Sequence, residues 1–156
     1  MNRHLSRVIV MQTLYEWDFR PKTEIEEIKK RNIENYHEEA DDSYIDDTIK
    51  GVIKGQKKID EEITKAAPEW PIEQISSIDK TILRVAIFEI LRSQDVPPKV
   101  AINEAVELGK TFGGQNSSKF INGVLGTVYR HSSKYNPEDD EYLKKEPTKN
   151  EPIQEK

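Results

Sequence analysis

Residues 76–128 decide the fold, and they read SSIDKTILRVAIFEILRSQDVPPKVAINEAVELGKTFGGQNSSKFINGVLGTV. An apolar pattern with helical spacing covers residues 78–91 and is broken at Val96-Pro97-Pro98, because proline lacks the amide and restricts the residue before it. A second helical pattern runs from Lys99 to Phe112, and Gly113-Gly114 ends it. A third begins with Asn116 or Ser117 as its cap. The stretch predicts three consecutive helices, of which the first is the central and most buried.

Three more helices are expected before this stretch. Residues 3–19 carry apolar side chains at helical spacing, and Pro21 ends that pattern. Thr23-x-x-Glu26 resembles a capping box that opens a weaker second helix, and Ser43-x-x-Asp46 repeats the signal before a long apolar stripe that stops at Pro68. No segment has the alternation of a convincing strand. The predicted fold class is therefore all-α.

Length and composition indicate one domain with a polar extension. The chain has 156 residues, of which 34% are charged, and it contains no cysteine, so disulfides and thiolate metal sites are excluded. The longest apolar run near the start is too short for a signal-peptide core, and we expect a cytoplasmic protein. We predict an ordered domain over residues 1–135. Residues 136–156 are expected to form a disordered acidic tail, because they are almost free of apolar side chains.

The net charge of −5 conceals an uneven distribution. Residues 77–135 contain eight basic and five acidic side chains, whereas residues 136–156 contain seven acidic and four basic ones. Because a local basic excess can bind nucleic acid even in an acidic protein, the net charge does not exclude an RNA ligand.

Several short motifs have ordinary structural explanations. Gly113-Gly114 before a helix could bind phosphate, but it lacks the spacing of a phosphate-binding loop, and a helix C-cap explains it better. The three histidines are scattered, and Glu104 with Glu107 are accompanied by no nucleophile. We therefore expect no metal site, no cofactor and no catalytic residue.

A basic and aromatic set is more informative. It consists of cationic and aromatic residues in the first and last helices, namely Arg3, Arg7, Tyr15, Lys119 and Phe120. Cationic groups neutralise phosphates and aromatic faces stack on unpaired bases, so the set suits single-stranded RNA. Tyr15 and Phe120 also lie at core-like spacings, so the residues alone favour packing for both, and packing and RNA contact can hold together.

Four phrases of the chain resemble the NusB family of transcription antitermination factors. They are Arg7…Gln12-x-Leu14-Tyr15-x-Trp17, Asp79-x-x-Ile82-Leu83-Arg84, the segment 102–108 (INEAVEL) and Phe120-Ile121-Asn122-Gly123. The resemblance implies an all-α fold of two small three-helix bundles packed at an angle, and a protein that is not an enzyme. It further implies that the chain pairs with NusE, a protein of the small ribosomal subunit. The pair then binds boxA RNA and keeps RNA polymerase elongating through ribosomal RNA operons.

The resemblance also assigns residues to each ligand. It implies RNA contacts for Arg7, Tyr15, Lys119 and Phe120, with Arg3 as a weaker candidate, and it places Glu73 and Asp79 on the face that receives NusE. The chain departs from the family pattern at two places that affect the expected affinity for RNA. The N-terminal arm has fewer basic residues than many members carry, which predicts weaker binding without NusE. Asn116 stands where the family often has an acidic residue, which favours RNA.

Two alternatives remain open. The chain could be a stand-alone relative of the NusB-like domain that heads some ribosomal RNA cytosine methyltransferases, although it lacks a glycine-rich cofactor loop. It could instead be a helical interaction module without an RNA ligand, which self-associates as a homodimer through the apolar stripes of its third and fifth helices.

Overall fold

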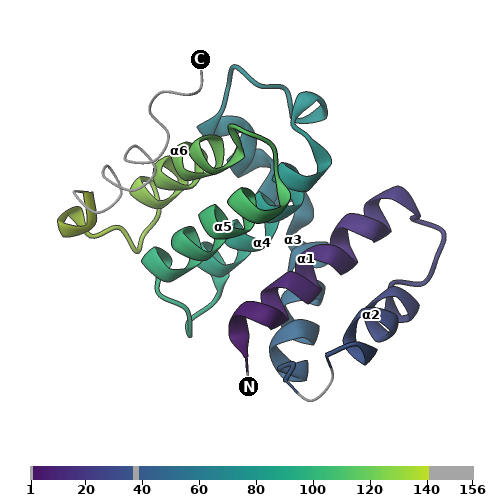
Figure 1. Ribbon diagram of the computed structural model, residues 1–156. Helices are drawn as coiled ribbons and strands as arrows, with labels where there is room; N and C mark the ends of the chain where they lie inside the picture. Colours follow the sequence, from purple (N-terminus) through teal and green to yellow (C-terminus); the bar gives the residue numbers. More distant parts are fainter. Residues whose placement is uncertain (1, 37–38, 141–156) are drawn as a thin grey trace. The chain divides into compact units, whose positions relative to one another are not determined.

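The computed structural model describes residues 2–36 and 39–140, and these residues form helices and connecting turns without a strand. Six α-helices and two short 3-10 helices follow in the order α1 Arg3–Phe19, α2 Ile25–Glu34, α3 Asp42–Ala66, η1 Ile72–Gln74, α4 Ser77–Arg92, α5 Pro98–Phe112, α6 Ser117–Arg130 and η2 Pro137–Asp139 (Figure 1). The predicted all-α class is confirmed. Within the described ranges no helix has the length and apolar character needed to cross a membrane.

The chain divides into two compact units, Met1–Gly55 and Gln56–Lys156, with the boundary inside α3. In the first unit α1 and α2 lie side by side (Figure 1). The two helices are joined by a hydrogen bond from Asn32 Nδ2 to Thr13 Oγ1 (3.1 Å) and by an ion pair between Arg31 and Glu16. Apolar side chains from all three helices of the unit are buried, including Ile9, Met11, Ile28, Ile45 and Ile49.

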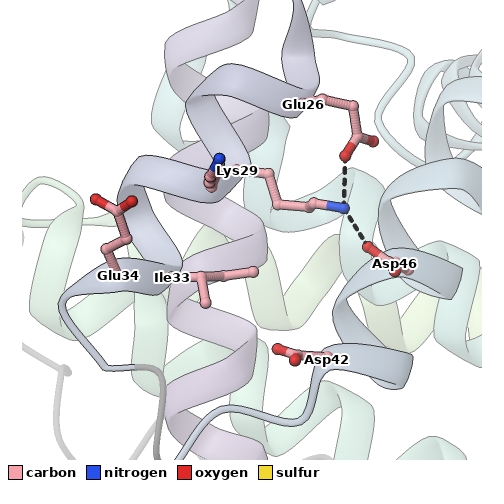
Figure 2. Close-up of a pocket in the computed structure, with 7 residues that line it drawn as sticks. Glu26, Lys29, Ile33, Glu34, Asp42 and Asp46 are labelled. Carbon is pink, nitrogen blue, oxygen red and sulfur yellow. Dashed lines mark hydrogen bonds and ion pairs between the residues drawn. The ribbon is translucent and has the colours of Figure 1, made fainter.

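Lys29 connects α2 to the first turns of α3 (Figure 2). Its Nζ lies 2.7 Å from Glu26 Oε1 and also donates a hydrogen bond to Asp46 Oδ1, while its side chain is only 14% exposed. Burial opposes the lysine charge, but the hydrogen bonds and charges of Asp46 and Glu26 outweigh it and raise the pKa of Lys29 above its ordinary value of 10.5. The ammonium group therefore stabilises this unit.

We expect Lys29→Met to lower the free energy of unfolding by about 1 kcal/mol, because it removes the cation and leaves two carboxylates facing each other. The measurement is urea unfolding near pH 7. The matched control is Lys30→Met, since Lys30 is an exposed neighbour on the same helix. Equal stability of both variants would contradict the role assigned to Lys29.

Two of the predicted capping boxes are wrong in position. The cap of α2 is Glu24 and makes no side-chain capping bond, so Thr23 lies one residue too early. At the start of α3 the amide of Tyr44 donates to Asp41 Oδ1 (3.1 Å), so Asp41 and not Ser43 satisfies the first turn. In each case an acidic residue within two positions of the expected hydroxyl residue takes its place, and spacing alone did not distinguish them.

In the second unit α4 lies at the centre, as the sequence predicts. Residues 81–87 are all buried, so this part of α4 is enclosed on every side and not only on one broad face. The enclosed run includes Arg84, whose guanidinium donates to both carboxylate oxygens of Asp60 on α3, each at 2.9 Å. A buried guanidinium is tolerated here because the carboxylate accepts its hydrogen bonds and balances its charge. The cap of α4 is Ser76, as predicted, and its Oγ accepts from the amide of Asp79 (3.2 Å).

Helices α5 and α6 pack side by side (Figure 1). Their close approach depends on Gly109, because a Cβ there would lie 2.8 Å from Ile121 Cδ1 and 3.4 Å from the Ser118 backbone. The break at Pro97-Pro98 and the end at Gly113 fall as predicted, with Pro98 itself as the first helical residue.

Residues beyond α6 fold back as a hydrogen-bonded segment. The hydroxyl of Tyr129 donates to Asp139 Oδ2 (2.5 Å) and accepts from the amide of Asn136 (3.0 Å), while Tyr135 donates to Asp140 Oδ2 (2.7 Å). Residues 136–140, which the sequence analysis assigned to the tail, thus include η2 and two carboxylates that accept hydrogen bonds from tyrosines. The boundary at residues 135/136 stays a prediction. The expected tail from residue 141 onward lies outside the described residues.

Tyr129 supplies a pH-dependent contribution to this segment. It is buried, with 1% of its surface exposed, and burial together with the hydrogen bond to Asp139 raises the pKa of its phenol above the ordinary value of 10. The contribution to stability is therefore complete below pH 10 and is lost as the pH rises through the higher folded-state value.

We expect Tyr129→Phe to lower the free energy of unfolding by about 1–2 kcal/mol at pH 8, since it removes one donor and one acceptor from a buried site. The difference from wild type should shrink above pH 10. Chemical unfolding at a series of pH values measures both effects, with Tyr36→Phe, at an exposed position, as the control. A difference that persists unchanged above pH 10 would exclude the phenol proton as its source.

Candidate nucleic-acid interface

A pocket of about 360 Å³ in the second unit collects several of the predicted site residues. It lies among the turn after α3, η1, the first turn of α4 and the start of α6. Its walls combine aromatic and apolar side chains with amides and one carboxylate, from Trp70, Gln74, Ile75, Ser76, Asp79, Gly114, Asn116, Ser117 and Phe120. Small-molecule sites commonly combine such apolar and aromatic walls with a few polar groups that set the orientation of the ligand.

The turn between α5 and α6 shapes one rim of the pocket. Ser117 Oγ accepts a hydrogen bond from the amide of Gly114 (2.8 Å), and the Ser117 amide donates to the Gly114 carbonyl (3.2 Å). Gly113 fits against this turn only without a side chain, because a Cβ would lie 2.5 Å from Ser117 Cβ. The φ angle of Gly113 is −93°, so its backbone is not left-handed. Glycine is required at this C-cap because the atoms of Ser117 lie too close for a side chain.

Asp79 lies in the pocket wall as a buried carboxylate with one oxygen that accepts no hydrogen bond from the described residues. Its surface is only 9% exposed, and Oδ1 has no hydrogen-bond partner among the described residues. A buried acceptor without a donor costs about 1–3 kcal/mol relative to a satisfied one. The oxygen without a partner is thus enclosed in the wall and not open to the pocket.

Two aromatic rings form the apolar part of the pocket. Trp70 and Phe120 meet edge to face, with their centroids 6.2 Å apart and their planes at 73°. Trp70 is 50% exposed and Phe120 is half-buried, so both rings can contact a ligand as well as each other. Trp70 was not predicted as a site residue; a large aromatic residue outside any helical pattern was the signal available there.

The start of α6 creates a positive electrostatic potential beside this pocket. Asn116 is its N-cap but makes no side-chain capping bond, and both Asn116 and Lys119 are exposed. The first amides of a helix and the positive end of its dipole attract anions, and Lys119 adds a full charge. Three of the predicted RNA residues, Asn116, Lys119 and Phe120, are thus brought together within one helical turn.

The two predicted RNA-binding arginines of the first unit, Arg3 and Arg7, have internal partners. The guanidinium carbons of Arg3 and Arg7 lie 4.4 and 5.4 Å from the ring centroid of Tyr44, and Arg3 pairs with Asp41 at 3.1 Å. Arg7 is buried, with 4% of its surface exposed, which differs from the exposed phosphate contact expected for it. Tyr44 was not singled out in the sequence, because a tyrosine in the first turn of a helix has no distinctive pattern.

Tyr15 belongs to a partly exposed aromatic pair. It is half-buried and meets Phe19 edge to face at 5.0 Å, and Phe19 is 60% exposed. The ring packs on one side and borders solvent on the other, so its packing role is observed and its RNA contact stays a prediction. Glu73 is exposed on η1.

The comparisons with known proteins agree with these features. The NusB family model matches residues 4–130. A transcription antitermination protein NusB from Dehalococcoides mccartyi (strain CBDB1) is 46% identical over 127 residues, which cover 81% of this chain and 89% of the relative. The chain belongs to the NusB family. Another NusB, from Oceanobacillus iheyensis, is 41% identical and is covered over 98% of its length.

Solved structures extend the likeness to the fold. The chain matches T. maritima NusB with a TM-score of 0.76 and 29% identity, covering 90% of this chain and 98% of that one. It also matches a chain in the crystal structure of the antitermination factors NusB and NusE in complex with dsRNA, with a TM-score of 0.73 and 24% identity. The NusB-like fold that the resemblance implied is confirmed.

The α5–α6 turn of this NusB-family protein provides a stability test. We expect Gly113→Ala to destabilise the second unit by about 1–3 kcal/mol, because the new methyl group meets Ser117 and the Gly109 carbonyl. Gly114→Ala is the matched control, since a Cβ there meets nothing within 4 Å. Urea unfolding of both variants gives the comparison, and equal losses would show that close packing does not govern this turn.

Proposed function

We propose that this NusB-family protein acts without catalysis as a transcription antitermination factor, which binds boxA-type RNA together with NusE and supports processive transcription of ribosomal RNA operons. The observation that carries the proposal is the 46% identity to a transcription antitermination protein over 89% of that relative. The RNA polymerase antitermination complex is the assembly in which the pair works.

The proposed RNA surface in the second unit is the start of α6. Lys119 and the helix N-terminus supply positive potential for phosphates, and Phe120 supplies an aromatic face for a base. In the first unit Tyr15 and Phe19 offer a second aromatic surface. Arg3, which is 43% exposed beside Asp41, contributes less, because its charge is partly neutralised. Arg7 supports this region from a buried position.

The proposed contact with NusE is acidic. Glu73 is the exposed acidic side chain on η1, and it suits a basic partner by charge complementarity. Asp79, which the resemblance also assigns to NusE, is only 9% exposed, so little of its surface is open to a partner.

The test measures binding of a labelled boxA-type RNA by fluorescence anisotropy at a stated salt concentration, with and without NusE and against a scrambled RNA. We expect selective binding that NusE strengthens. Lys119→Glu should weaken RNA binding by roughly ten-fold and flatten its dependence on salt, because each phosphate contact contributes to the salt slope.

The matched control is Lys58→Glu, which reverses an equally exposed lysine on α3. Arg7 is unsuitable for charge reversal, because an unpaired buried carboxylate would destabilise the fold itself. An absence of selective RNA binding in both the presence and the absence of NusE would refute the proposed function.

A further inference from the structure

The segment that follows α6 is attached to the second unit mainly by polar contacts. We call residues 131–140 the strap. None of these ten residues is buried, and the one ring contact of the strap is that of Tyr135 with Tyr129, edge to face at 5.5 Å. A segment that buries so little apolar surface opens at a lower free-energy cost than the helices beneath it.

Two carboxylates attach the strap to α6 and α5. Asp139 accepts the hydrogen bond of Tyr129 through Oδ2, and its Oδ1 lies 3.5 Å from Lys99 Nζ on α5. Asp140 Oδ1 lies 3.2 Å from Arg130 Nε at the end of α6. The side chains of Lys99 and Arg130 are 50% and 37% exposed, so dissolved salt can screen both ion pairs.

A lysine attaches the strap to the end of α4. Lys134 Nζ donates a hydrogen bond of 2.6 Å to the carbonyl of Ser93, which is the C-cap of α4. The last carbonyls of a helix lack partners within the helix, and a cation there also suits the negative end of the helix dipole. Lys134 therefore stabilises the end of α4 only while the strap is closed.

The strap thus contacts both helices that are joined by residues 93–97, at Ser93 on one side and at Lys99 on the other. This α4–α5 turn has little stabilisation of its own. The N-cap of α5 is Pro97, which makes no side-chain capping bond, and Val96 is the one buried side chain among the five residues of the turn. Loss of the strap would therefore loosen the turn as well.

We propose that the strap and the α4–α5 turn form a conformational switch, which opens and closes as one unit while the helices stay folded and which responds to ionic strength. Opening would release the hydroxyl of Tyr129, the C-terminal carbonyl of α4 and the charge of Lys99 from their partners in the strap. The strap follows the last residue of α6, whereas the proposed RNA surface lies at the first turn of that helix. The switch is therefore separate from the proposed RNA function.

Hydrogen–deuterium exchange of the full chain, followed by mass spectrometry at about 50 mM and about 1 M sodium chloride, tests the switch. The amides of Val100 and Ala101 report on the turn, because they donate to the Pro97 carbonyl (3.0 and 3.1 Å). We expect high salt to accelerate exchange in the strap and at these two amides by the same factor. The expected factor is roughly five, the effect of one screened ion pair on a local equilibrium. Residues 81–87 of α4 should exchange at an unchanged rate.

Two variants break separate attachments of the strap. Asp139→Asn removes the charge that faces Lys99, and Lys134→Met removes the hydrogen bond to the end of α4. Each should accelerate exchange in both the strap and the turn by about five- to ten-fold at low salt, and Asp139→Asn should also reduce the response to salt. The matched control is Glu138→Gln, because Glu138 is an exposed carboxylate next to Asp139 in η2, and it should exchange as wild type does.

Several outcomes would overturn the switch. One is exchange of the strap only at the rate of residues 81–87, since the strap would then open only when the whole unit unfolds. Another is acceleration of the strap by Asp139→Asn while Val100 and Ala101 stay unchanged, because strap and turn would then open independently. A rate that does not depend on salt in the wild type would also exclude the proposal. Circular dichroism verifies that the helices of each variant are intact, and none of these outcomes affects the proposed RNA function.

Discussion

The close approach of α5 and α6 is the constraint on which the candidate interface depends. Gly109 allows the two helices to touch, and Gly113 with Ser117 turns the chain so tightly that α6 begins beside the first turn of α4. A larger residue at either glycine would separate the helices, because the atoms in the way belong partly to backbone. The position of Asn116 and Phe120 around Asp79 is therefore a consequence of helix packing.

Much of the fold could be predicted from the sequence because prolines and glycines mark where helices must end. Pro21, Pro68, Pro97 and the Gly113-Gly114 pair each lie at or just beyond a helix terminus. The exact caps at Glu24 and Asp41 could not be predicted, since several acidic and hydroxyl side chains compete within two residues. The spacing of apolar residues identifies one buried face of α4, but it does not reveal that every residue from 81 to 87 is buried.

The candidate site was harder to predict, because charge in a sequence does not say which partner neutralises it. The basic excess over residues 77–135 includes Arg84, which Asp60 engages, and Arg130, which lies 3.2 Å from Asp140. Arg3 and Arg7 likewise stack on Tyr44. The positive charge available to RNA is consequently smaller than the number of basic residues suggests. Lys119 therefore supplies a larger share of that charge.

The pocket joins residues that the family resemblance assigns to two different ligands. Asn116 and Phe120 are assigned to RNA and Asp79 to a protein, yet all three line one cavity. An RNA at the start of α6 and a protein at the exposed Glu73 would bind to adjoining elements, since Gln74 of η1 and Phe120 of α6 line the same pocket. If one ligand orders the turn around Trp70, the other ligand binds to a surface that is already ordered. Thermodynamic linkage then requires that RNA raises the affinity for NusE by the same factor as NusE raises the affinity for RNA.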